Sequence, residues 1–322
     1  MTGHRIVVVG SYATGLTMRV DRLPSPGETL LGKGYRVDFG GKGSNQAVAC
    51  ARLGARVSFV AKIGRDNFGE MALGLHRQEK INIDSVIQAS DEPTGVGFII
   101  VDSSGNNCIT IDPGANDLLT ATEVSQRLNA LTSETVVLTQ LEIPVEAAHA
   151  AMALGREKRW VTILNPAPVR ILPQSVLQLV DILTPNQTEA KVLTGRSPEA
   201  DIAPEPVARE LIRRGVKQVV ITLGEKGALL VTADSSLYTP AIKVPVADTT
   251  GAGDSFNAGL AVALSCGANL EDAVRFAVVT GGLAVTREGV VPSLPTHDEV
   301  LRFYRQQGST PPDWLSEEAT DK

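Results

Sequence analysis

ETVVLTQLEIPVEAAHAAMALGREKRWVTILN, residues 134–165, decides the fold class because it contains a strand, a helix and a second strand in succession. Its two ends, 134–141 and 159–165, are short runs rich in β-branched residues, as is typical of strands. Residues 145–158 between them place apolar side chains at helical spacing. A helical connection of this kind joins parallel strands, so the stretch predicts an α/β protein.

The same alternation of strand and helix runs through most of the chain. Continuous apolar strands separated by helices favour a mostly parallel sheet that is covered on both faces. The other expected strands are 6–10, 57–64, 180–186 and 217–224, and the other expected helices are 44–54, 68–80, 189–195, 207–215, 251–265, 270–285 and one near 296–306.

Two stretches in the first third of the chain break this alternation. TLLGKGYRVDFGG (29–41) alternates without a preceding helix, and GVGFIIVDSSGNNCITID (95–112) has the pattern of a hairpin. We expect lid strands from about 12–40 and 95–112 to form a small sheet that projects over an open active site. We expect residues 1–307 to form a single domain and residues 308–322 to form a polar, frayed tail.

The composition narrows the possible partners and the cellular compartment. The chain has 322 residues and a net charge of −6, without a run of Lys and Arg, which argues against sequence-independent binding to nucleic acid or to an anionic membrane. Cys50, Cys108 and Cys266 lie far apart, as expected for buried thiols in a reducing compartment. Because no stretch is long and apolar enough to span a membrane, we expect a cytoplasmic protein.

Polar residues recur where the expected strands end. In open parallel sheets, ligands bind in the crevice beyond the carboxyl ends of the strands. We therefore expect these residues to surround a ligand site: Glu142, Asn165, Asn186 with Glu189, and Thr222.

DTTGAGDSFNAG (248–259) is the strongest candidate for the chemistry. Gly251, Ala252 and Gly253 let the main chain approach a ligand, and the N–H groups of the helix that follows favour an anion. Phosphoryl transfer needs such a site, and Asp254 beside it can accept the proton of an attacking hydroxyl. Taken alone, the motif fits a tight turn with an N-terminal helix acid better. The polar strand ends favour the catalytic interpretation.

GGKGSNQ (40–46) is a second candidate site at the start of another helix. Its glycines allow close approach of a ligand and Asn45 supplies a donor and an acceptor, which suits polyol hydroxyls. It does not match a phosphate P-loop, because Gly43 stands where Ser or Thr would hold Mg²⁺. A glycine turn that opens a core helix explains it equally well.

Two weaker motifs complete the set. Asn186 and Glu189 have the spacing to reach Mg²⁺ and its waters, although a helix capping box is the more common explanation of that spacing. LGEKG (223–227) fits either a nucleotide loop or a hairpin turn.

Together these motifs resemble the ribokinase family, also called the phosphofructokinase-B group of carbohydrate kinases, and within it the ribokinase branch most closely. The similarity covers nearly the whole chain, to about residue 306. It is carried by PGETL (26–30), GGKGSNQAVACARLG (40–54) with Gly64, TQLEIP (139–144), LNPAP (164–168), TPNQTEA (184–190), ITLGEKG (221–227), DTTGAGDSFNAG (248–259) and AVTREGVVPS (284–293).

The resemblance implies a three-layer α/β/α body with a β-sheet lid that is often used in dimer contacts. It also implies transfer of the ATP γ-phosphoryl group to a primary hydroxyl of a sugar, with Asp254 as base and the amides of Gly251, Ala252 and Gly253 as anion hole. The other implied roles are sugar binding by Gly41, Lys42, Asn45 and Glu142, contact with Mg²⁺ and the nucleotide by Asn186 and Glu189, nucleotide binding by Thr222, Gly224 and Gly227, and binding of an activating K⁺ by Asp248, Thr250, Ala284, Arg287, Gly289 and Ser293.

One departure from the family pattern concerns the sugar end. The resemblance predicts an Asn and an Asp after the first strand, but Ala13 and Gly15 stand there. Loss of the Asp removes hydrogen bonds worth on the order of 1.5–3 kcal/mol each, unless Thr14 or Asp38 replaces them. The resemblance makes a pentose, ribose or a ribose-like sugar, our first expectation, and this departure is the reason to consider other acceptors. A nucleoside, a deoxy sugar or a ketose phosphate remains an alternative acceptor, and a non-catalytic sugar-binding regulator is an alternative of another class.

Overall fold

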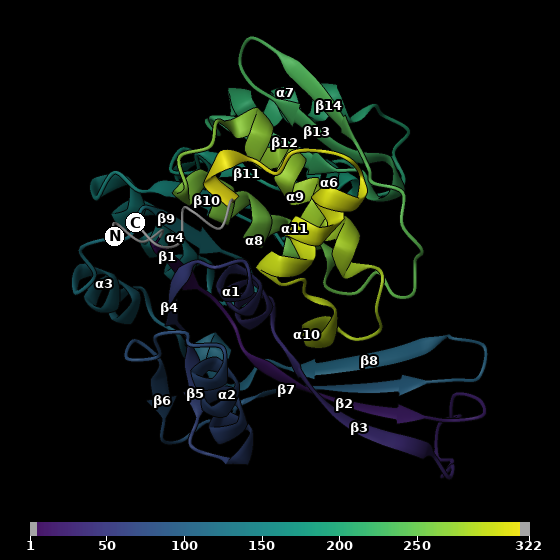
Figure 1. Cartoon of the computed structure of the whole chain (residues 1–322). Coiled ribbons are helices and arrows are strands. Elements are labelled where there is room, and N and C mark those ends of the chain that lie inside the picture. The colour runs from purple at the N-terminus through teal and green to yellow at the C-terminus, as the bar shows by residue number, and fades with distance from the viewer. Residues whose placement is uncertain (1–4, 316–322) are drawn as a thin grey trace.

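An eight-stranded sheet forms the centre of this computed structural model, which describes residues 5–315 (Figure 1). Its order is β14-β13-β12-β11-β10-β9-β1-β4, and the strands from β12 to β4 are parallel. The opening prediction is confirmed, since Val136 of β9 pairs in parallel with Val161 of β10. The strands are β1 (Arg5–Val9), β4 (Arg56–Val60), β9 (Val136–Thr139), β10 (Val161–Leu164), β11 (Ile182–Leu183), β12 (Gln218–Thr222), β13 (Gly227–Val231) and β14 (Ser236–Pro240).

Helices cover both faces of this sheet, which confirms the predicted three-layer α/β/α architecture. Alternate residues of β1 enter the two cores: Ile6 and Val8 face one, and Val7 and Val9 face the other. The first face carries α1 (Lys42–Arg52), α8 (Ala252–Ser265), α9 (Leu270–Ala284) and α11 (His297–Gln306), and the second carries α3 (Ala121–Asn129), α4 (Val145–Glu157), α6 (Gln187–Leu193) and α7 (Pro204–Arg213). None of the helices between residues 5 and 315 combines the length and the apolar character needed to cross a membrane.

A separate four-stranded sheet projects from the body, as expected for the lid (Figure 1). Its order is β3-β2-β7-β8, with β2 parallel to β7 and antiparallel to β3. The strands are β2 (Ala13–Arg19), β3 (Lys33–Gly40), β7 (Gly95–Val101) and β8 (Asn107–Asp112). The chain between β4 and β7 forms α2 (Asn67–Gln78) and the short parallel pair β5 (Lys62–Gly64) and β6 (Ile87–Ala89).

The sequence patterns missed several elements at the margins of the fold. The antiparallel hairpin of β13 and β14 closes one edge of the main sheet, so that sheet is not parallel throughout. The helix α3 and the short helices α5 (Gln174–Leu177) and α10 (Val290–Ser293) were also not predicted.

The expectation of a frayed tail from residue 308 is wrong for the part of it that the structure describes. Leu315 is only 3% exposed, and the Trp314 ring packs against Phe276 with centroids 4.9 Å apart. His297 Nε2 also lies 2.9 Å from the Leu315 backbone oxygen. Apolar burial therefore fastens this segment to α9 and α11, and only residues 316–322 of the expected tail lie outside the described residues.

Candidate active site

Asp254 lies in the first turn of α8, where the amino end of α1 packs against it. Its side chain is buried, with 7% of the residue exposed. Asn45 Nδ2 donates to one carboxylate oxygen at 2.9 Å, and Gln46 Nε2 donates to the other at 3.0 Å. Two amides from one helix therefore fix the orientation of the carboxylate on another helix.

The charges around Asp254 keep this buried acid suited to accept a proton. Burial raises the pKa of Asp254, and the positive charge of Lys42 together with the two amide hydrogen bonds offsets part of that rise. Burial lowers the pKa of Lys42, but the neighbouring carboxylates of Asp254, Glu142 and Glu189 outweigh it, so that the pKa is raised overall. Lys42 thus stays cationic between three acids contributed by different parts of the chain.

The start of α8 leaves backbone donors free. Gly251 adopts a left-handed conformation with φ of 84°, and a side chain there would approach Val290 Cγ1 to 2.9 Å. A side chain on Gly253 would meet nothing within 4 Å, so this glycine faces open space. Among the described residues, the N–H groups of Gly251, Gly253 and Asp254 have no acceptor, whereas Ala252 donates weakly to Thr249 at 3.3 Å. These free amides at a helix amino end suit an anion.

A buried polar network holds Gln46 in place behind the carboxylate. Gln46 Nε2 also donates to Asn165 Oδ1 at 3.2 Å, and Gln140 Nε2 donates to Gln46 Oε1. Sequence reasoning identified Asn165 at its strand end but missed both glutamines. Gln46 and Gln140 could have been noticed because each is an amide within a largely apolar, buried segment, where a polar side chain needs a hydrogen-bond partner.

A second polar chain ties the sheet to the first turn of α8. Thr184 Oγ1 donates to Asn257 Oδ1 at 2.6 Å, and Asn257 Nδ2 donates to the Gly253 backbone oxygen at 2.8 Å. The glycine turn is therefore anchored to the carboxyl end of β11 by side chains that the sequence analysis did not single out.

The amino end of α1 and the loop after β9 meet at Glu142. One carboxylate oxygen of Glu142 accepts from Ser11 Oγ at 2.6 Å and from the Lys42 backbone N–H at 2.7 Å. Gly41, with φ of 85°, passes so close to Tyr12 that a Cβ would lie 2.6 Å from the Tyr12 Cα. The structure thus brings these predicted residues together, and Ser11 is an additional member that the sequence did not indicate.

Asn45 carries a buried acceptor without a partner. Its Nδ2 donates to Asp254, but its Oδ1 accepts no hydrogen bond within the described residues. A buried amide oxygen is costly when it is left unpaired. An incoming hydroxyl group would satisfy it.

Thr14 and Asp38 were the two residues considered as replacements for the Asp that the family pattern predicts at Gly15. Thr14 is fully buried, and its Oγ1 lies 3.2 Å from the Tyr12 hydroxyl, so it cannot take over the lost role. Gly15 pairs across the lid with Asp38, and a Cβ on Gly15 would lie 3.8 Å from the Asp38 Cβ. Asp38 is therefore the acid nearest to the vacant position, although it is paired with Arg36 at 2.7 Å.

At the predicted nucleotide end, Asn186 and Glu189 form the capping box that was the alternative explanation. Glu189 N donates to Asn186 Oδ1, and Asn186 N donates to Glu189 Oε2, both at 2.8 Å. Burial raises the pKa of Glu189, against the opposing effect of its hydrogen bond with Asn186 and of Lys42. Glu189 Oε1 is left outside this box. The described residues contain no cluster of three or more His, Cys, Asp or Glu that could hold a metal by itself.

Thr222 and the glycines that follow it lie beside this capped helix. Thr222 N donates to the Pro185 oxygen at 3.0 Å, so β12 ends next to the start of α6. Gly224 and Gly227 have φ of 60° and 107°, and a Cβ on Gly227 would lie 2.1 Å from the Thr239 oxygen. The turn is thus the connection between β12 and β13, as the hairpin alternative expected.

The two loops predicted to form a monovalent-cation site are in contact. One oxygen of Asp248 accepts from Thr250 N and Oγ1 at 2.9 and 2.7 Å, and the other accepts from Gly289 N at 3.1 Å. Burial raises the pKa of Asp248, but these hydrogen bonds outweigh it and hold the pKa below its usual range. The Arg287 side chain points elsewhere, to Glu299 at 2.8 Å and to the Ser293 oxygen at 3.2 Å.

Comparison with known sequences identifies the family. Residues 4–297 match the pfkB family of carbohydrate kinases. The chain is 37% identical to the ribokinase of Haemophilus influenzae over 92% of this chain and 97% of that protein. It is 38% identical to a bifunctional ribokinase/ribose-5-phosphate isomerase A of Fructilactobacillus sanfranciscensis, with 95% of this chain aligned, but it spans only 57% of that longer protein. A deoxyribokinase of Salmonella typhi is 32% identical over 92% of this chain and 98% of that protein.

Comparison with solved structures agrees with the sequence match. The structure of Arabidopsis thaliana ribokinase complexed with ribose and ATP is 31% identical to this chain, with a TM-score of 0.85 over 94% of this chain and 98% of that one. This chain therefore belongs to the pfkB family of carbohydrate kinases, and it is a ribokinase-like, ATP-dependent sugar kinase.

Proposed function

We propose that this kinase transfers the γ-phosphoryl group of ATP to the primary hydroxyl of a pentose, ribose or a ribose-like sugar, with Asp254 as general base. The observation that carries this proposal is a buried carboxylate beside the free amides at the start of α8. Relatives named ribokinase, and a neighbour solved with ribose and ATP, support the choice of substrates.

In the proposed mechanism, Asp254 accepts the proton of the sugar hydroxyl as the oxygen attacks the γ-phosphorus. The new O–P bond forms while the bond to the bridging β,γ-oxygen breaks, and ADP departs with the electron pair of that bond. The amides of Gly251 and Gly253 stabilise negative charge on the transferring group, and Lys42 adds a positive charge nearby. Asn45 and Gln46 hold the base in line and prevent its rotation.

We propose that the nucleotide lies along Thr222, Gly224 and Gly227. A cleft of about 510 Å³ adjoins this turn, because Tyr238 Oη, which lines the cleft, donates to the Lys226 oxygen at 2.5 Å. Its walls include apolar side chains that suit an adenine ring: Leu237, Pro240, Ile242, Val278 and Val279.

Asn186 and Glu189 fit a magnesium ion held mainly by water and phosphate. Mg²⁺ in phosphotransferases usually keeps several waters and uses few protein carboxylates, so a site without a protein ligand cluster is compatible with it. Glu189 Oε1 lies outside the capping box and can bind such a water. When bound, Mg²⁺ supplies charge neutralisation for the phosphates.

The loop pair at Asp248 and Gly289 fits an activating potassium ion. The backbone oxygens of Asp248, Thr250 and Arg287 accept no hydrogen bond from any residue between 5 and 315. Unpaired carbonyl oxygens are the ligands expected for a hard monovalent cation. Asp248 and Thr250 lie in the loop that leads directly to Gly251. An ion bound there would stabilise the conformation of the backbone that forms the anion hole.

A deoxy sugar is the second candidate acceptor. Gly15 removes the carboxylate expected to bind sugar hydroxyls, and Thr14 cannot replace it. A sugar with fewer hydroxyl groups loses less from that change, and a relative of nearly equal length is named deoxyribokinase. A nucleoside or a ketose phosphate remains a less supported alternative.

An acceptor panel, measured as ADP release with saturating MgATP, tests these proposals. We expect the highest kcat/KM with ribose or a deoxypentose, and lower rates when sodium or a bulky organic cation replaces potassium. Ribose turnover below that of nucleosides or ketose phosphates would contradict the pentose assignment. Equal rates in all three cations would contradict the potassium assignment. Saturable sugar binding without ADP formation for any acceptor would instead indicate a non-catalytic regulator.

We also propose that the lid mediates a homodimer. Several large apolar side chains are exposed on its sheet or beside it, and no strand within residues 5–315 pairs with the outer edges of β3 and β8. These side chains are Leu31, Tyr35, Phe98, Ile109 and Ile111. Analytical ultracentrifugation tests this: a dimer that Phe98→Glu converts to monomers supports it, and a wild-type monomer at high protein concentration contradicts it.

A cytoplasmic location is the last part of the proposal. Within the described residues Cys50, Cys108 and Cys266 are all free thiols, which suits a reducing compartment where ATP is available.

A further inference from the structure

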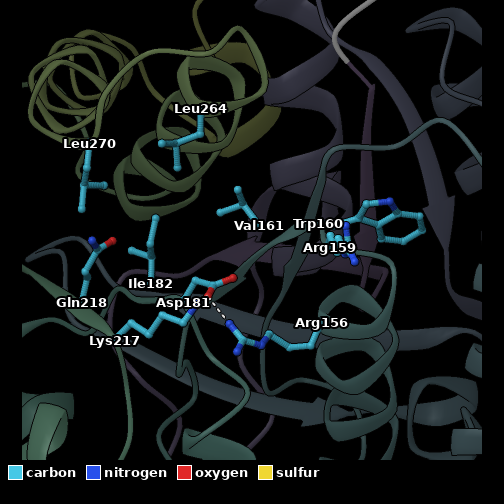
Figure 2. A pocket seen from close by; sticks show the side chains of 10 residues that line it. All are labelled: Arg156, Arg159, Trp160, Val161, Asp181, Ile182, Lys217, Gln218, Leu264 and Leu270. Carbon is cyan, nitrogen blue, oxygen red and sulfur yellow. Dashed lines mark hydrogen bonds and ion pairs between the residues drawn. The ribbon is translucent and has the colours of Figure 1, made fainter.

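A cavity of about 540 Å³ opens where the central strands of the main sheet begin. The active site lies at the other end of these strands. Figure 2 shows its side chains, which come from the amino ends of β10, β11 and β12, from the end of α4 and from the helices α8 and α9. Asp254 lies at the other end of α8 from Leu264, which lines this cavity. The cavity is therefore separate from the site proposed for sugar and ATP.

Positive charge dominates one wall of this cavity. Arg156 Nη1 and Lys217 Nζ both lie at Oδ1 of Asp181, at 2.7 and 2.5 Å. The other oxygen of Asp181 accepts from Thr162 N and Oγ1, both at 2.9 Å. Both oxygens of the Asp181 carboxylate therefore have partners. Its single negative charge neutralises only one of the two positive charges of Arg156 and Lys217.

Arg159 adds a third cation to the lining of the cavity. Its guanidinium has no hydrogen bond or ion pair within the described part of the chain, and the residue is exposed. Together with Arg156 and Lys217, it leaves two positive charges unbalanced beside one carboxylate. A dianion is the ligand that would neutralise this excess.

Arg159 has a left-handed backbone conformation, which usually favours glycine over a residue with a side chain. It follows the end of α4 with φ of 62°. Lys80 occupies the equivalent position after α2 with φ of 58°, but it does not line the cavity. The conformation alone is therefore no sign of a site, and Lys80 provides a matched control for Arg159.

The opposite wall is apolar. Leu264 and Leu270 face Val161 and Ile182 across the cavity, as Figure 2 shows, and Gln218 adds an amide at the side. Inorganic phosphate would leave these side chains uncovered. The volume lies within the range of cavities that bind small organic ligands.

From this combination we infer a second ligand site, which binds a small organic phosphate monoester with an apolar body. Its phosphate dianion lies against Arg159, Arg156 and Lys217, and its apolar part lies against Leu264 and Leu270. Because the cavity and the active site lie at opposite ends of α8, a ligand in one does not exclude a ligand in the other.

Calorimetric titration with phenyl phosphate, carried out with excess MgAMP-PNP present to fill the nucleotide site, tests this inference. Phenyl phosphate supplies a dianion and an apolar ring, whereas inorganic phosphate and benzyl alcohol each supply only one of these. We expect saturable binding of phenyl phosphate that is at least several-fold tighter than that of either control. Arg159→Gly should weaken it by about tenfold, since one charged donor is removed, and Lys80→Gly should leave it unchanged.

Both glycine variants should fold, because glycine relieves the same backbone conformation in each, and their melting temperatures check this. Lys217→Gln provides a second variant on the same wall and should also weaken binding. The inference is overturned by the absence of saturable binding at millimolar phenyl phosphate while MgAMP-PNP is present, or by equal affinity in the Arg159→Gly and Lys80→Gly proteins. Binding of either control as tightly as phenyl phosphate overturns the assigned ligand class.

Discussion

The candidate active site has two ends, the start of α8 with Asp254 and the lid strand β2 with Gly15. They differ in how completely their polar groups are paired. At the α8 end, both oxygens of Asp254 receive amide donors, and the Gln46 amide is itself held by the buried side chains of Asn165 and Gln140. At the lid end, Gly15 contributes no side chain and Thr14 turns into the interior. Asn45 donates to Asp254, and within the described residues its side-chain oxygen has no partner.

This difference separates the chemistry from the choice of substrate. Preorganised donors and a fixed base serve any hydroxyl acceptor that reaches them. Contacts to the remaining hydroxyls discriminate one sugar from another, because a buried polar group left unpaired is penalised. Under the proposed mechanism, the residues for phosphoryl transfer are therefore present, whereas the residues expected to bind the sugar hydroxyls depart from the family pattern.

The largest expected effect is that of breaking the α8 end. Asp254→Ala should lower kcat by on the order of 10³-fold or more, because it removes the proposed general base, while nucleotide binding is retained. Turnover by coupled ADP release and nucleotide affinity by calorimetry measure the two effects.

Glu123 supplies the matched control for Asp254. It is also the third residue of its helix, α3, where it forms a capping box with Thr120. Glu123→Ala should lower stability by about 1 kcal/mol and leave kcat within about twofold. If Asp254→Ala behaves like Glu123→Ala, Asp254 is only a helix acid, and the proposed mechanism fails.

Restoring the lid end should have the next largest effect. Gly15→Asp places a carboxylate beside Asp38, and the nearest atoms to the new Cβ lie at 3.7 Å, which is ordinary van der Waals contact. A charged hydrogen bond to a sugar hydroxyl is worth about 1.5–3 kcal/mol, so the KM for ribose should fall by about tenfold or more. Gly15→Asn, which lacks the charge, should give a smaller gain. An unchanged or higher KM for ribose in Gly15→Asp would show that this position does not face the acceptor.

The pH profile sharpens the description of the α8 end. Asp254 acts as a base only when ionised, so kcat should fall as the pH drops through its pKa in the folded enzyme. Burial raises that pKa and Lys42 opposes the rise. Lys42→Met should therefore move the acid limb of the kcat profile to higher pH, and Lys42→Arg should largely restore it. A shift to lower pH would contradict the assignment of Asp254 as the group that titrates.

The sequence predicted the body of the fold because the parallel strands are continuous apolar runs separated by helices. Val136 and Val161 lie in such runs, and they pair as expected. The hairpin of β13 and β14 was missed because it adds antiparallel strands without an intervening helix. Leu315 was assigned to a tail because its neighbours are polar, and burial of Trp314 and Leu315 against α9 and α11 depends on tertiary contacts.

The candidate site was predictable where the fold rule placed polar residues at strand ends. Glu142 and Glu189, for example, surround Lys42 as that rule implies. Gln46 and Thr14 were not predictable, because each depends on which way one side chain points. Gln46 turns toward Asp254 from a helix that otherwise packs in the core, and Thr14 turns away from the cleft to the Tyr12 hydroxyl.

The smallest expected effect concerns Glu189, which has both a capping and a metal-binding explanation. Gln serves in a capping box as well as Glu does, so Glu189→Gln should keep the melting temperature while it raises the KM for MgATP a few-fold, through loss of a carboxylate that binds magnesium-bound water. Asn186→Ala should instead lower stability by about 1 kcal/mol, because it removes the cap from α6. Thermal unfolding and initial rates over a magnesium titration measure the two effects. If Glu189→Gln leaves the magnesium dependence unchanged, the capping box is the whole role of Glu189, and the metal must be held by phosphate and by other residues of the cleft.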